Sequence, residues 1–582
     1  MKQYFRKLNR LRFLNLLGLF VPVLFSISFP ALSQSTKYFE KVFSTPYPFF
    51  EEGWHVNSLI DGYALSCGRA VAPSGITQAF AMKVDLSGNL NWEFLIQDTS
   101  SSNGFLSGCV VNDGFVHTGF RYDLATGKDR TLICKIDSSG NQLWQKLIGD
   151  TIKSNFIRSI GKTSDGGFIL SGHIEQVYWE GYVIKTDSLG NVEWTRQFNG
   201  PLIDDLWSIQ QLGDGSFISS GYTNYALGSG SVRIIKMDTQ GFQVWDSSYT
   251  FQNNTQIGRS IINSVDGGYI VGGITGSSVA TTSGLIFKID SSKSILWSKI
   301  LTEFSNGTGN PYVSRIMSLK ELADSSIICV GSIVLTTGLP QPTDNKLLLL
   351  KLDKFGNEIW RRIYAPMSSG DTYGEHIDLA SDGGFIMSGR TESPNNADVY
   401  LLKTNCLGFI TAPVANFDYS VIGTNVTFQN LSQFSDTCVY YFGDGDSLLI
   451  THTDTIPVVH NYSSQGWFNA YMVAYACGEN DSIQIPLYTG IDNGYEFIVN
   501  SFTLNPNPTT DFLSINYRIP KNVKTLKLIC LDITGRLIKE LLLDPNDTDY
   551  TMDVADFSPG SYMLYLQPDV LRVIGKKLIV LK

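Results

Sequence analysis

The hydrophobic positions of this chain fall in short runs separated by glycine-containing turns, and the pattern recurs seven times between residues 47 and 410. One copy reads Ser164-Asp-Gly-Gly-Phe-Ile-Leu-Ser-Gly172, followed after a loop by Lys185-Thr-Asp-Ser-Leu-Gly-Asn-Val-Glu-Trp194. The lysine returns in every copy, at Lys83, Lys135, Lys185, Lys236, Lys288, Lys351 and Lys403. The spacings of 52, 50, 51, 52, 63 and 52 residues are typical of an array of supersecondary units.

Each unit predicts four short strands. The Asp165-Gly-Gly167 segment is hairpin-turn chemistry, because glycine accepts positive φ without strain. The second turn, Asp187 to Asn191, suits a type I turn with a G1 bulge. The last strand carries a tryptophan in six units: Trp92, Trp144, Trp194, Trp245, Trp297 and Trp360. We expect these tryptophans to pack against the next unit and the turn aspartates to cap their own turns.

The lysine strand is apolar on both faces, since Val183 and Ile184 point to opposite sides of the sheet. A sheet buried on both faces lies between two neighbouring sheets, and a ring of small antiparallel sheets provides this for every copy. The seventh unit lacks a tryptophan strand, whereas Lys37 to Phe43 reads as a strand before the first unit. We therefore predict a seven-bladed β-propeller at 35–410, closed by the N-terminal strand.

The aspartate, glycine and tryptophan spacing resembles the tryptophan-docking motif of quinoprotein propellers, with one residue fewer in the turn. It is also similar to the Asp boxes of sialidases, with a longer spacing. The chain has no adjacent-cysteine pair of the quinoprotein type. It also shows no recognisable arginine cluster with a paired acid and nucleophile. We therefore expect no catalytic residues and no cofactor site.

Residues 411–489 change to longer alternating strands. The motifs Tyr440-Tyr-Phe-Gly-Asp-Gly445 and Pro457-Val-Val-His-Asn-Tyr462 resemble the signature of the PKD domain, an immunoglobulin-like β-sandwich. The usual tryptophan of the first motif is Tyr440 here. Two readings of the acidic turn remain open, because Asp444 and Asp446 fit either a tight turn or a contribution to calcium binding. We favour the turn, expect His460 and Tyr462 to be core and turn residues, and expect no metal site.

Residues 499–582, after a linker at 490–498, resemble the type A C-terminal sorting domain of type IX secretion in Bacteroidetes. The resemblance rests on an Asn-Pro-Asn-Pro start, an Asp-x-x-Gly-Arg turn, a Gly-x-Tyr strand start and two terminal lysines. These residues are Asn505, Pro506, Asn507, Pro508, Gly535, Arg536, Gly560, Tyr562, Lys576 and Lys582. The resemblance implies an immunoglobulin-like sandwich, type IX machinery as a partner, and attachment to surface lipopolysaccharide or release. The alternative is an ordinary terminal β-sandwich.

The N-terminus has the features of a signal peptide over residues 1–33. Five basic residues precede an apolar stretch from Phe13 to Leu32, which Pro22 and Pro30 interrupt. The Ala31-Leu32-Ser33 pattern predicts cleavage between Ser33 and Gln34. A transmembrane anchor is the alternative, because about 20 apolar residues span a bilayer. We expect a secreted or cell-surface protein.

The composition of the chain narrows the classes of partner and ligand that we expect it to bind. The net charge of −10 disfavours nucleic acid, because phosphate backbones are repelled by an acidic surface. The eight cysteines include no Cys-x-x-Cys pair and the chain has only six histidines, so a metal centre is poorly supported. Cys438 and Cys477 fall within one small module and are a possible disulfide, which export permits.

The favoured function is a non-catalytic surface or secreted protein whose propeller binds an extracellular glycan or protein, since the loops of a propeller set its ligand. The most variable loop is Leu335 to Asn345, a candidate contact site for which unselected loop growth is the alternative. A propeller-type polysaccharide hydrolase or lyase, with carboxylates, arginines or histidines converging at one end of the ring, is the second hypothesis. A structural adhesion component is the third.

Overall fold

The computed structural model describes residues 37–44, 51–71, 76–98, 100–200, 202–223, 230–251, 255–276, 282–301, 314–334, 345–366, 370–393, 396–451, 456–489, 502–519, 523–532, 536–568 and 574–581. All regular elements in these ranges are β-strands. No helix that is long and apolar enough to cross a membrane occurs in this described part. The expected signal peptide, its cleavage site at Ser33 and Gln34, and the linker at 490–498 lie outside the described residues.

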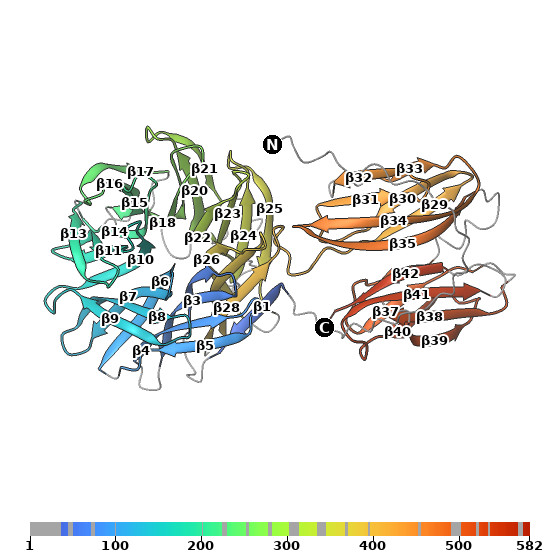
Figure 1. Ribbon diagram of the computed structural model, residues 1–582, viewed down its shortest axis with the longest axis horizontal. Coiled ribbons are helices and arrows are strands. Elements are labelled where there is room, and N and C mark those ends of the chain that lie inside the picture. The colour runs from blue at the N-terminus through green and yellow to red at the C-terminus, as the bar shows by residue number, and fades with distance from the viewer. Residues whose placement is uncertain are drawn as a thin grey trace, which may run out of the picture. The chain divides into compact units, whose positions relative to one another are not determined.

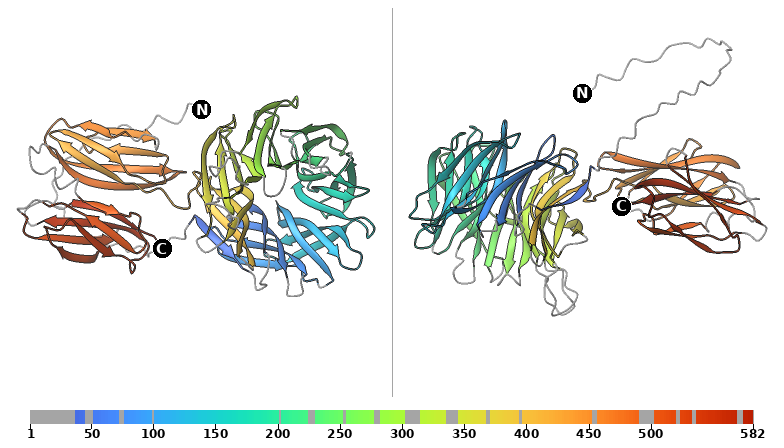
Figure 2. Two further views of the ribbon diagram at one scale, coloured as in Figure 1. Left: turned by 180° about the vertical axis from the view of Figure 1, so that it is seen from behind. Right: turned by 90° about the horizontal axis from the view of Figure 1, so that it is seen from below.

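Seven four-stranded antiparallel sheets are present in the described residues between 37 and 404, and they form a ring (Figures 1 and 2). Their innermost strands contact one another in order, and β26 contacts β2, so that the circle is complete. These innermost strands are β2 (Gly53–Ser58), β6 (Ser101–Val111), β10 (Asn155–Lys162), β14 (Asp205–Gln211), β18 (Thr255–Asn263), β22 (Ser314–Glu321) and β26 (Asp371–Leu379). The chain is therefore a β-propeller over this region.

Each sheet continues outward through three more strands. The second strands are β3 (Tyr63–Val71), β7 (Gly114–Asp123), β11 (Phe168–Glu175), β15 (Phe217–Thr223), β19 (Tyr269–Gly276), β23 (Ile327–Val334) and β27 (Phe385–Ser393). The third are β4 (Thr77–Val84), β8 (Lys128–Asp137), β12 (Trp179–Thr186), β16 (Ser231–Met237), β20 (Ser283–Ile289), β24 (Asn345–Leu352) and β28 (Asn396–Thr404). The outermost are β5 (Leu90–Leu95), β9 (Gln142–Ile148), β13 (Val192–Phe198), β17 (Gln243–Tyr249), β21 (Ile295–Ile300), β25 (Glu358–Tyr364) and β1 (Phe39–Phe43).

The two ends of the ring differ in their connections. The tight turn between the first and second strands lies at one end of every sheet, and in the six sheets whose four strands are consecutive the turn between the third and outermost strands lies at the same end. Antiparallel pairing therefore puts the other connections, which are longer and irregular, at the opposite end. We call this opposite end the loop end. The segment predicted as a variable contact site, Leu335 to Asn345, falls between β23 and β24, and its residues 335–344 lie outside the described part.

The recurring lysine reaches the aspartate of the first turn of its own sheet. In all seven sheets an ion pair joins the two side chains, and every one of these lysine side chains is at most 22% exposed. The nitrogen–oxygen distances are 2.7 Å for Lys83–Asp61, 2.7 Å for Lys135–Asp113, 2.8 Å for Lys185–Asp165, 3.6 Å for Lys236–Asp214, 2.6 Å for Lys288–Asp266, 3.7 Å for Lys351–Asp324 and 2.9 Å for Lys403–Asp382. The ion pair joins the third strand of each sheet to the turn between its first and second strands, which explains why both residues repeat.

The tryptophans join neighbouring sheets, as expected. Trp92 packs against Gly140 in the second turn of the next sheet, where an added methyl group would come within 2.9 Å of the indole. Its Nε1 donates a hydrogen bond to the carbonyl of Ser138 in the same turn at 3.0 Å. Gly140 also has φ of +90°, so both the conformation and the close approach favour glycine.

Strand β1 completes the last sheet, as the sequence predicted. It pairs antiparallel with β28, and Phe39 lies opposite Lys403 in the way that Trp144 lies opposite Lys135. The Phe39 side chain packs against Gly88 of the first sheet, within 2.8 Å of where a methyl group would stand. Phe39 therefore takes the place of a tryptophan and closes the ring from the N-terminal end of the chain.

Two further modules follow the ring, each built from a three-stranded and a four-stranded sheet around one apolar core. The first contains β29 (Phe417–Ile422), β30 (Asn425–Asn430), β31 (Thr437–Tyr441), β32 (Ser447–Thr451), β33 (Val458–Asn461), β34 (Gly466–Ala476) and β35 (Glu479–Thr489). The second contains β36 (Thr503–Asn505), β37 (Phe512–Asn516), β38 (Leu526–Asp532), β39 (Leu537–Leu543), β40 (Asp549–Asp553), β41 (Gly560–Pro568) and β42 (Ile574–Val580). Both are β-sandwiches.

The predicted disulfide between Cys438 and Cys477 is wrong. Cys477 is bonded to Cys406, which lies in the turn that follows β28. Cys438 is a free, fully buried thiol whose side chain belongs to the core of the first sandwich. Cys477 instead occupies the exposed turn between β34 and β35, so the alternation of β31 directs the Cys438 thiol away from that turn.

We predict that Phe39→Ala destabilises the ring by about 3–5 kcal/mol, because a buried aromatic side chain is removed from the closing contact. Val42→Ala on the same strand is the matched control, since Val42 is 42% exposed and its truncation should change stability by about 0.5 kcal/mol or less. Urea unfolding of both variants measures the difference. Equal stability of the two variants would contradict closure by Phe39.

Peptide mapping tests the disulfide. Digestion without reduction should yield one cross-linked species that contains Cys406 and Cys477, and the Cys438 peptide should carry the alkylating label after denaturation. Reduction before digestion is the control and should separate the linked peptides. A cross-link between the Cys438 and Cys477 peptides would restore the pairing that the sequence suggested and refute the one described.

Candidate functional site

Every innermost strand of the ring has a β-bulge at the same position, where its pairing with the second strand skips one residue. Each skipped residue stands seven positions before the aspartate of the first turn. Bulges redirect side chains and are frequent next to functional sites. The seven bulged residues differ from sheet to sheet and are Trp54, Leu106, Arg158, Trp207, Arg259, Met317 and Glu375.

Three of these residues form one stack. The guanidinium of Arg158 lies 3.7 Å from the ring centre of Trp207, and the guanidinium of Arg259 lies 3.6 Å from it. Both distances are well inside the range of cation–π interactions. Because the three residues come from three consecutive sheets, the bulges direct them toward one another on the inner side of the ring.

The side chain of Asp205, two residues before Trp207, contacts two polar side chains of the neighbouring sheet. Its fully buried carboxylate accepts a hydrogen bond from Nε of Arg158 at 2.5 Å, and Nδ1 of His173 lies 3.1 Å from its other oxygen. Burial alone would raise the pKa of Asp205, but the charges and hydrogen bonds of Arg158 and His173 hold it below its ordinary value. The Asp205 carboxylate is therefore a firmly ionised acceptor.

A second charged group lies on the two sheets at the ring closure. Arg390 on β27 donates hydrogen bonds to Glu375 at 2.9 Å and to Glu392 at 2.6 Å, and its Nε lies 3.5 Å from Glu52. Burial raises the pKa of Glu375, against the attraction of Arg390, and the nearby Glu52 raises it further. This side of the cluster is rich in carboxylate oxygens.

Arg259 is the cation of the cluster with the least compensation. Burial lowers the pKa of its guanidinium to about 10, and repulsion from Arg158 and Arg315 acts in the same direction. Glu375 and Asp205 oppose that effect. Five innermost strands therefore contribute charge to one electrostatically coupled group, which we call the axial cluster: Arg158, Asp205, Arg259, Arg315 and Glu375, with Trp207, Trp54, Glu52 and Arg390 beside them.

A column of parallel aromatic rings leads from the axial cluster toward the loop end. Phe156 stacks on His173 at 5.6 Å between ring centres, and His173 stacks on Trp179 at 4.3 Å, with 8° between the planes in both pairs. Trp179 begins β12 and is 42% exposed, and the adjacent Tyr178 is 47% exposed. Two aromatic side chains are therefore available at the surface directly beside buried charge.

The residue after each bulge belongs to the frame of the ring. Ser107, Ser208 and His376 each accept a hydrogen bond from a backbone N–H of the next sheet, at 3.3 to 3.4 Å. His376 stacks on His55, the equivalent residue of the adjacent sheet, with ring centres 3.7 Å apart. Ser66 and His117 make a further buried hydrogen bond at 2.8 Å.

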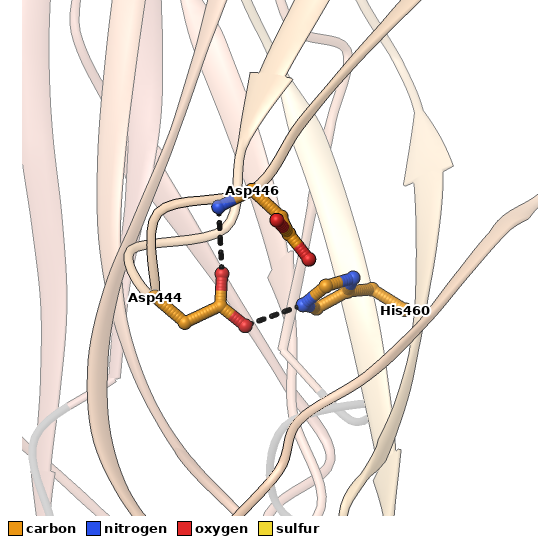
Figure 3. A group of neighbouring side chains, drawn as sticks. All are labelled: Asp444, Asp446 and His460. Atoms are coloured by element: carbon orange, nitrogen blue, oxygen red, sulfur yellow. Dashed lines mark hydrogen bonds and ion pairs between the residues drawn. The ribbon is translucent and has the colours of Figure 1, made fainter.

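A possible metal-binding group lies in the first sandwich. Asp444, Asp446 and His460 bring their potential ligand atoms within 4.8 Å of one another (Figure 3). His460 Nε2 already pairs with Asp444 at 2.6 Å, and the Asp446 backbone N–H donates to the same carboxylate at 3.1 Å. His460 stacks on Phe442, and Tyr462 is buried. Tyr462 therefore lies in the core, whereas the half-buried His460 is bonded to the acidic turn.

The predicted sorting residues lie in the second sandwich. Asn507 ties the start of that module to β42, since its side chain donates to the Lys577 carbonyl at 2.7 Å and accepts from the Ile579 N–H at 2.9 Å. Both Asn505-Pro506 and Asn507-Pro508 are cis. Arg536 pairs with Asp532 and Tyr562 donates to the Ser558 carbonyl.

The remaining sorting residues divide between the described and the undescribed parts of the chain. Lys576 pairs with Asp418 of the first sandwich at 2.9 Å. Gly560 begins β41. Gly535 and Lys582 lie outside the described residues.

Residues 503–581 match the family of secretion system C-terminal sorting domains, which confirms that the end of the chain is a sorting domain. The protein is therefore exported to the cell surface or secreted, and its sorting domain implies contact with the type IX secretion machinery. Among curated proteins, none matches the chain.

Several solved propeller structures are similar in fold. The WD40 domain of Pan2 from Neurospora crassa is 11% identical, with 60% of this chain and 88% of that chain covered and a TM-score of 0.37. A PL25 polysaccharide lyase, an ulvan lyase, is 9% identical, with 62% and 96% covered and a TM-score of 0.43. The β-propeller domain of the Trilobed protease from Pyrococcus furiosus is 9% identical, with 63% and 97% covered and a TM-score of 0.35. Similarities this low assign no function.

The sequence reasoning missed the axial cluster, although a signal for it exists. The position seven residues before the turn aspartate holds a different residue type in most units, whereas the positions around it repeat. An alignment of the seven repeat units at that position identifies Arg158, Trp207, Arg259 and Glu375.

Acid should loosen the ring through its buried histidines. Burial lowers the pKa of His117 to about 3 and the pKa of both His55 and His376 to well below 6.5. Repulsion from Lys320 lowers the pKa of His55 and of His376 further, whereas attraction to Asp378 raises the pKa of His55. Each histidine is neutral in the fold but takes up a proton on unfolding below pH 6.5. The stability that each provides is therefore complete above pH 6.5 and is lost as the pH falls, by up to about 1.4 kcal/mol per pH unit.

The free energy of unfolding in urea, measured between pH 7 and pH 5, tests this, because most carboxylates titrate below this range. His117→Gln should remove the contribution of one histidine from the slope, whatever it does to the stability at pH 7. An unchanged slope in His117→Gln would show that this histidine is not buried in its neutral form.

Proposed function

We propose that this exported protein is a non-catalytic binding protein whose propeller takes up an extracellular glycan or protein at the loop end. The observation that carries the proposal is the axial cluster. Charged and aromatic side chains converge there from two inner positions of the repeat that vary, the bulged position and the position two residues before it. Variation at a few positions of an otherwise regular frame is what a ligand-binding surface requires.

In this proposal the seven sheets are the blades of one seven-bladed propeller at 35–410, sealed by the N-terminal strand. An immunoglobulin-like, PKD-like module at 411–489 and a linker at 490–498 connect it to an immunoglobulin-like sorting domain at 499–582. A signal peptide at 1–33 directs export from a Bacteroidetes cell. The type IX machinery then removes the sorting domain, and the protein is attached to surface lipopolysaccharide or released.

The geometry of the cluster suits recognition. Arg158 and Arg390 are held by carboxylates on rigid strands, so their donors are presented in fixed directions. Arg158 and Arg259 both stack on the ring of Trp207, which leaves its buried indole Nε1 as the polar atom without a partner in the described residues. The exposed Trp179 and Tyr178 add apolar surface close by. A preorganised site of this kind loses little conformational entropy on binding.

A polysaccharide hydrolase or lyase is the second candidate. The group that favours it is His173, Asp205 and Arg158, in which a carboxylate lies beside both an imidazole and a guanidinium. An imidazole oriented by a carboxylate is a general acid–base arrangement. Here Asp205 engages Arg158 more closely than His173, at 2.5 Å against 3.1 Å, so the non-catalytic hypothesis remains the proposal.

Screening of the chain from Gln34 onward against extracellular polysaccharides and proteins tests the proposal, with release of reducing ends or unsaturated products measured in parallel. Saturable binding without turnover is the expected result. Trp179→Ala should weaken binding about 5- to 10-fold, as expected for loss of one aromatic contact. Trp467→Ala is the control, because this tryptophan is similarly exposed but belongs to the first sandwich. Turnover that is lost in His173→Ala would establish the enzyme instead.

A further inference from the structure

Unpartnered polar atoms gather at the axial cluster. On the donor side, buried Nε of Arg259 and buried Nε1 of Trp54 and Trp207 have no hydrogen-bond partner among the described residues. On the acceptor side the same holds for Oε2 of Glu52 and Oε2 of Glu375. The Glu375 side chain is only 6% exposed. Buried polar atoms in folded proteins are normally hydrogen-bonded, so such a concentration points to a ligand.

The charges of the cluster are distributed unevenly. Asp205 balances Arg158, whereas Arg390 has three glutamates around it. In the described part of the chain, neither Arg259 nor Arg315 forms an ion pair with a carboxylate. The cluster therefore has two guanidinium groups without a direct ion-pair partner among the described residues, although Glu375 and Asp205 act on Arg259 electrostatically, and it has carboxylate oxygens able to accept further hydrogen bonds.

We propose that the axial cluster binds the anionic group of an acidic saccharide, a carboxylate or a sulfate, through Arg259 and Arg315. This inference rests on the proposed function and names its ligand class. Planar guanidinium groups match carboxylate and sulfate oxygens in geometry and form charge-assisted hydrogen bonds with them. The indole N–H of Trp207 lies in the same stack and supplies a further donor.

The carboxylate side of the cluster fits the remainder of such a ligand. Glu52 and Glu375 would accept hydrogen bonds from sugar hydroxyl groups, which are donors that a simple inorganic anion lacks. The exposed Trp179 and Tyr178 offer faces on which the apolar side of further sugar rings can pack.

The overall negative charge of the protein opposes the approach of polyanions, so binding at the axial cluster has to come from short-range contacts. A net charge of −10 repels polyanions at long range, and this repulsion is screened by salt over about 8–10 Å. The attraction inside the cluster is short-ranged and little screened because its groups are buried. Binding of an acidic saccharide should therefore depend only weakly on ionic strength, unlike the binding of a polyanion to a basic surface.

Calorimetry on the chain from Gln34 onward tests the inference, with glucuronate oligosaccharides, glucose 6-sulfate and neutral gluco-oligosaccharides as probes. We expect the two anionic probes to bind at least about 10-fold more tightly than the neutral probe. Arg259→Gln should remove that preference and Arg259→Lys should retain part of it. Arg196→Gln, on outer strand β13, is the matched control and should bind as the wild type. The two anionic probes separate carboxylate from sulfate recognition.

Thermal unfolding of the wild-type chain provides a readout that needs no variant, since a ligand of the native state raises Tm. Glucuronate oligosaccharides should raise Tm and neutral ones should not. Equal binding of acidic and neutral saccharides overturns the inference and leaves the proposed function standing. Equal binding of an oligoglutamate, with the same dependence on Arg259, overturns the assignment to a saccharide. Failure of all glycans and proteins to bind overturns both.

Discussion

The packing of one sheet on the next is the interaction on which this structure depends. A four-stranded sheet with apolar side chains on both faces, such as the one that contains Val183 and Ile184, is stable only between two neighbours. Five of the six tryptophans of the outer strands reach a glycine of the following sheet, as Trp92 reaches Gly140, whereas the turn that follows Trp245 has Lys293 in the equivalent position. Phe39 makes the same contact from the N-terminal strand, so the first and last sheets also have neighbours on both sides.

The repeated and the varied positions have separate tasks. The Lys–Asp pair recurs within each sheet, and a contact between an aromatic side chain and a turn glycine recurs between most neighbouring sheets, because these contacts hold the frame together. The bulged position contributes little to this frame, and its residue type is free to differ between sheets. Arg158, Arg259 and Glu375 meet there although each comes from a different repeat, and burial in the ring strengthens the electrostatic coupling between them.

The sequence alone was sufficient to predict the structural features that depend on a local, repeating pattern. The turn chemistry, the sheets and the closing strand all follow from positions that repeat, and Phe39 could be recognised because its surroundings mimic those of Trp144. The axial cluster does not follow from the repeated positions, since its residues come from positions that vary and meet only because the bulges turn them inward. The disulfide was misassigned for a related reason. Proximity in sequence suggested Cys438, but strand alternation buries that thiol in the core and the turn of Cys477 lies against Cys406.

A crystal structure of the chain from Gln34 onward, soaked with a glucuronate oligosaccharide, is the most direct test of the claim that a regular ring presents its varied inner positions to a ligand on its axis. The account predicts seven four-stranded sheets with the N-terminal strand in the last sheet and a bulge in each innermost strand. It also predicts that the sugar carboxylate contacts Arg259. Innermost strands paired without bulges, or a saccharide bound only on the outer strands, would contradict it.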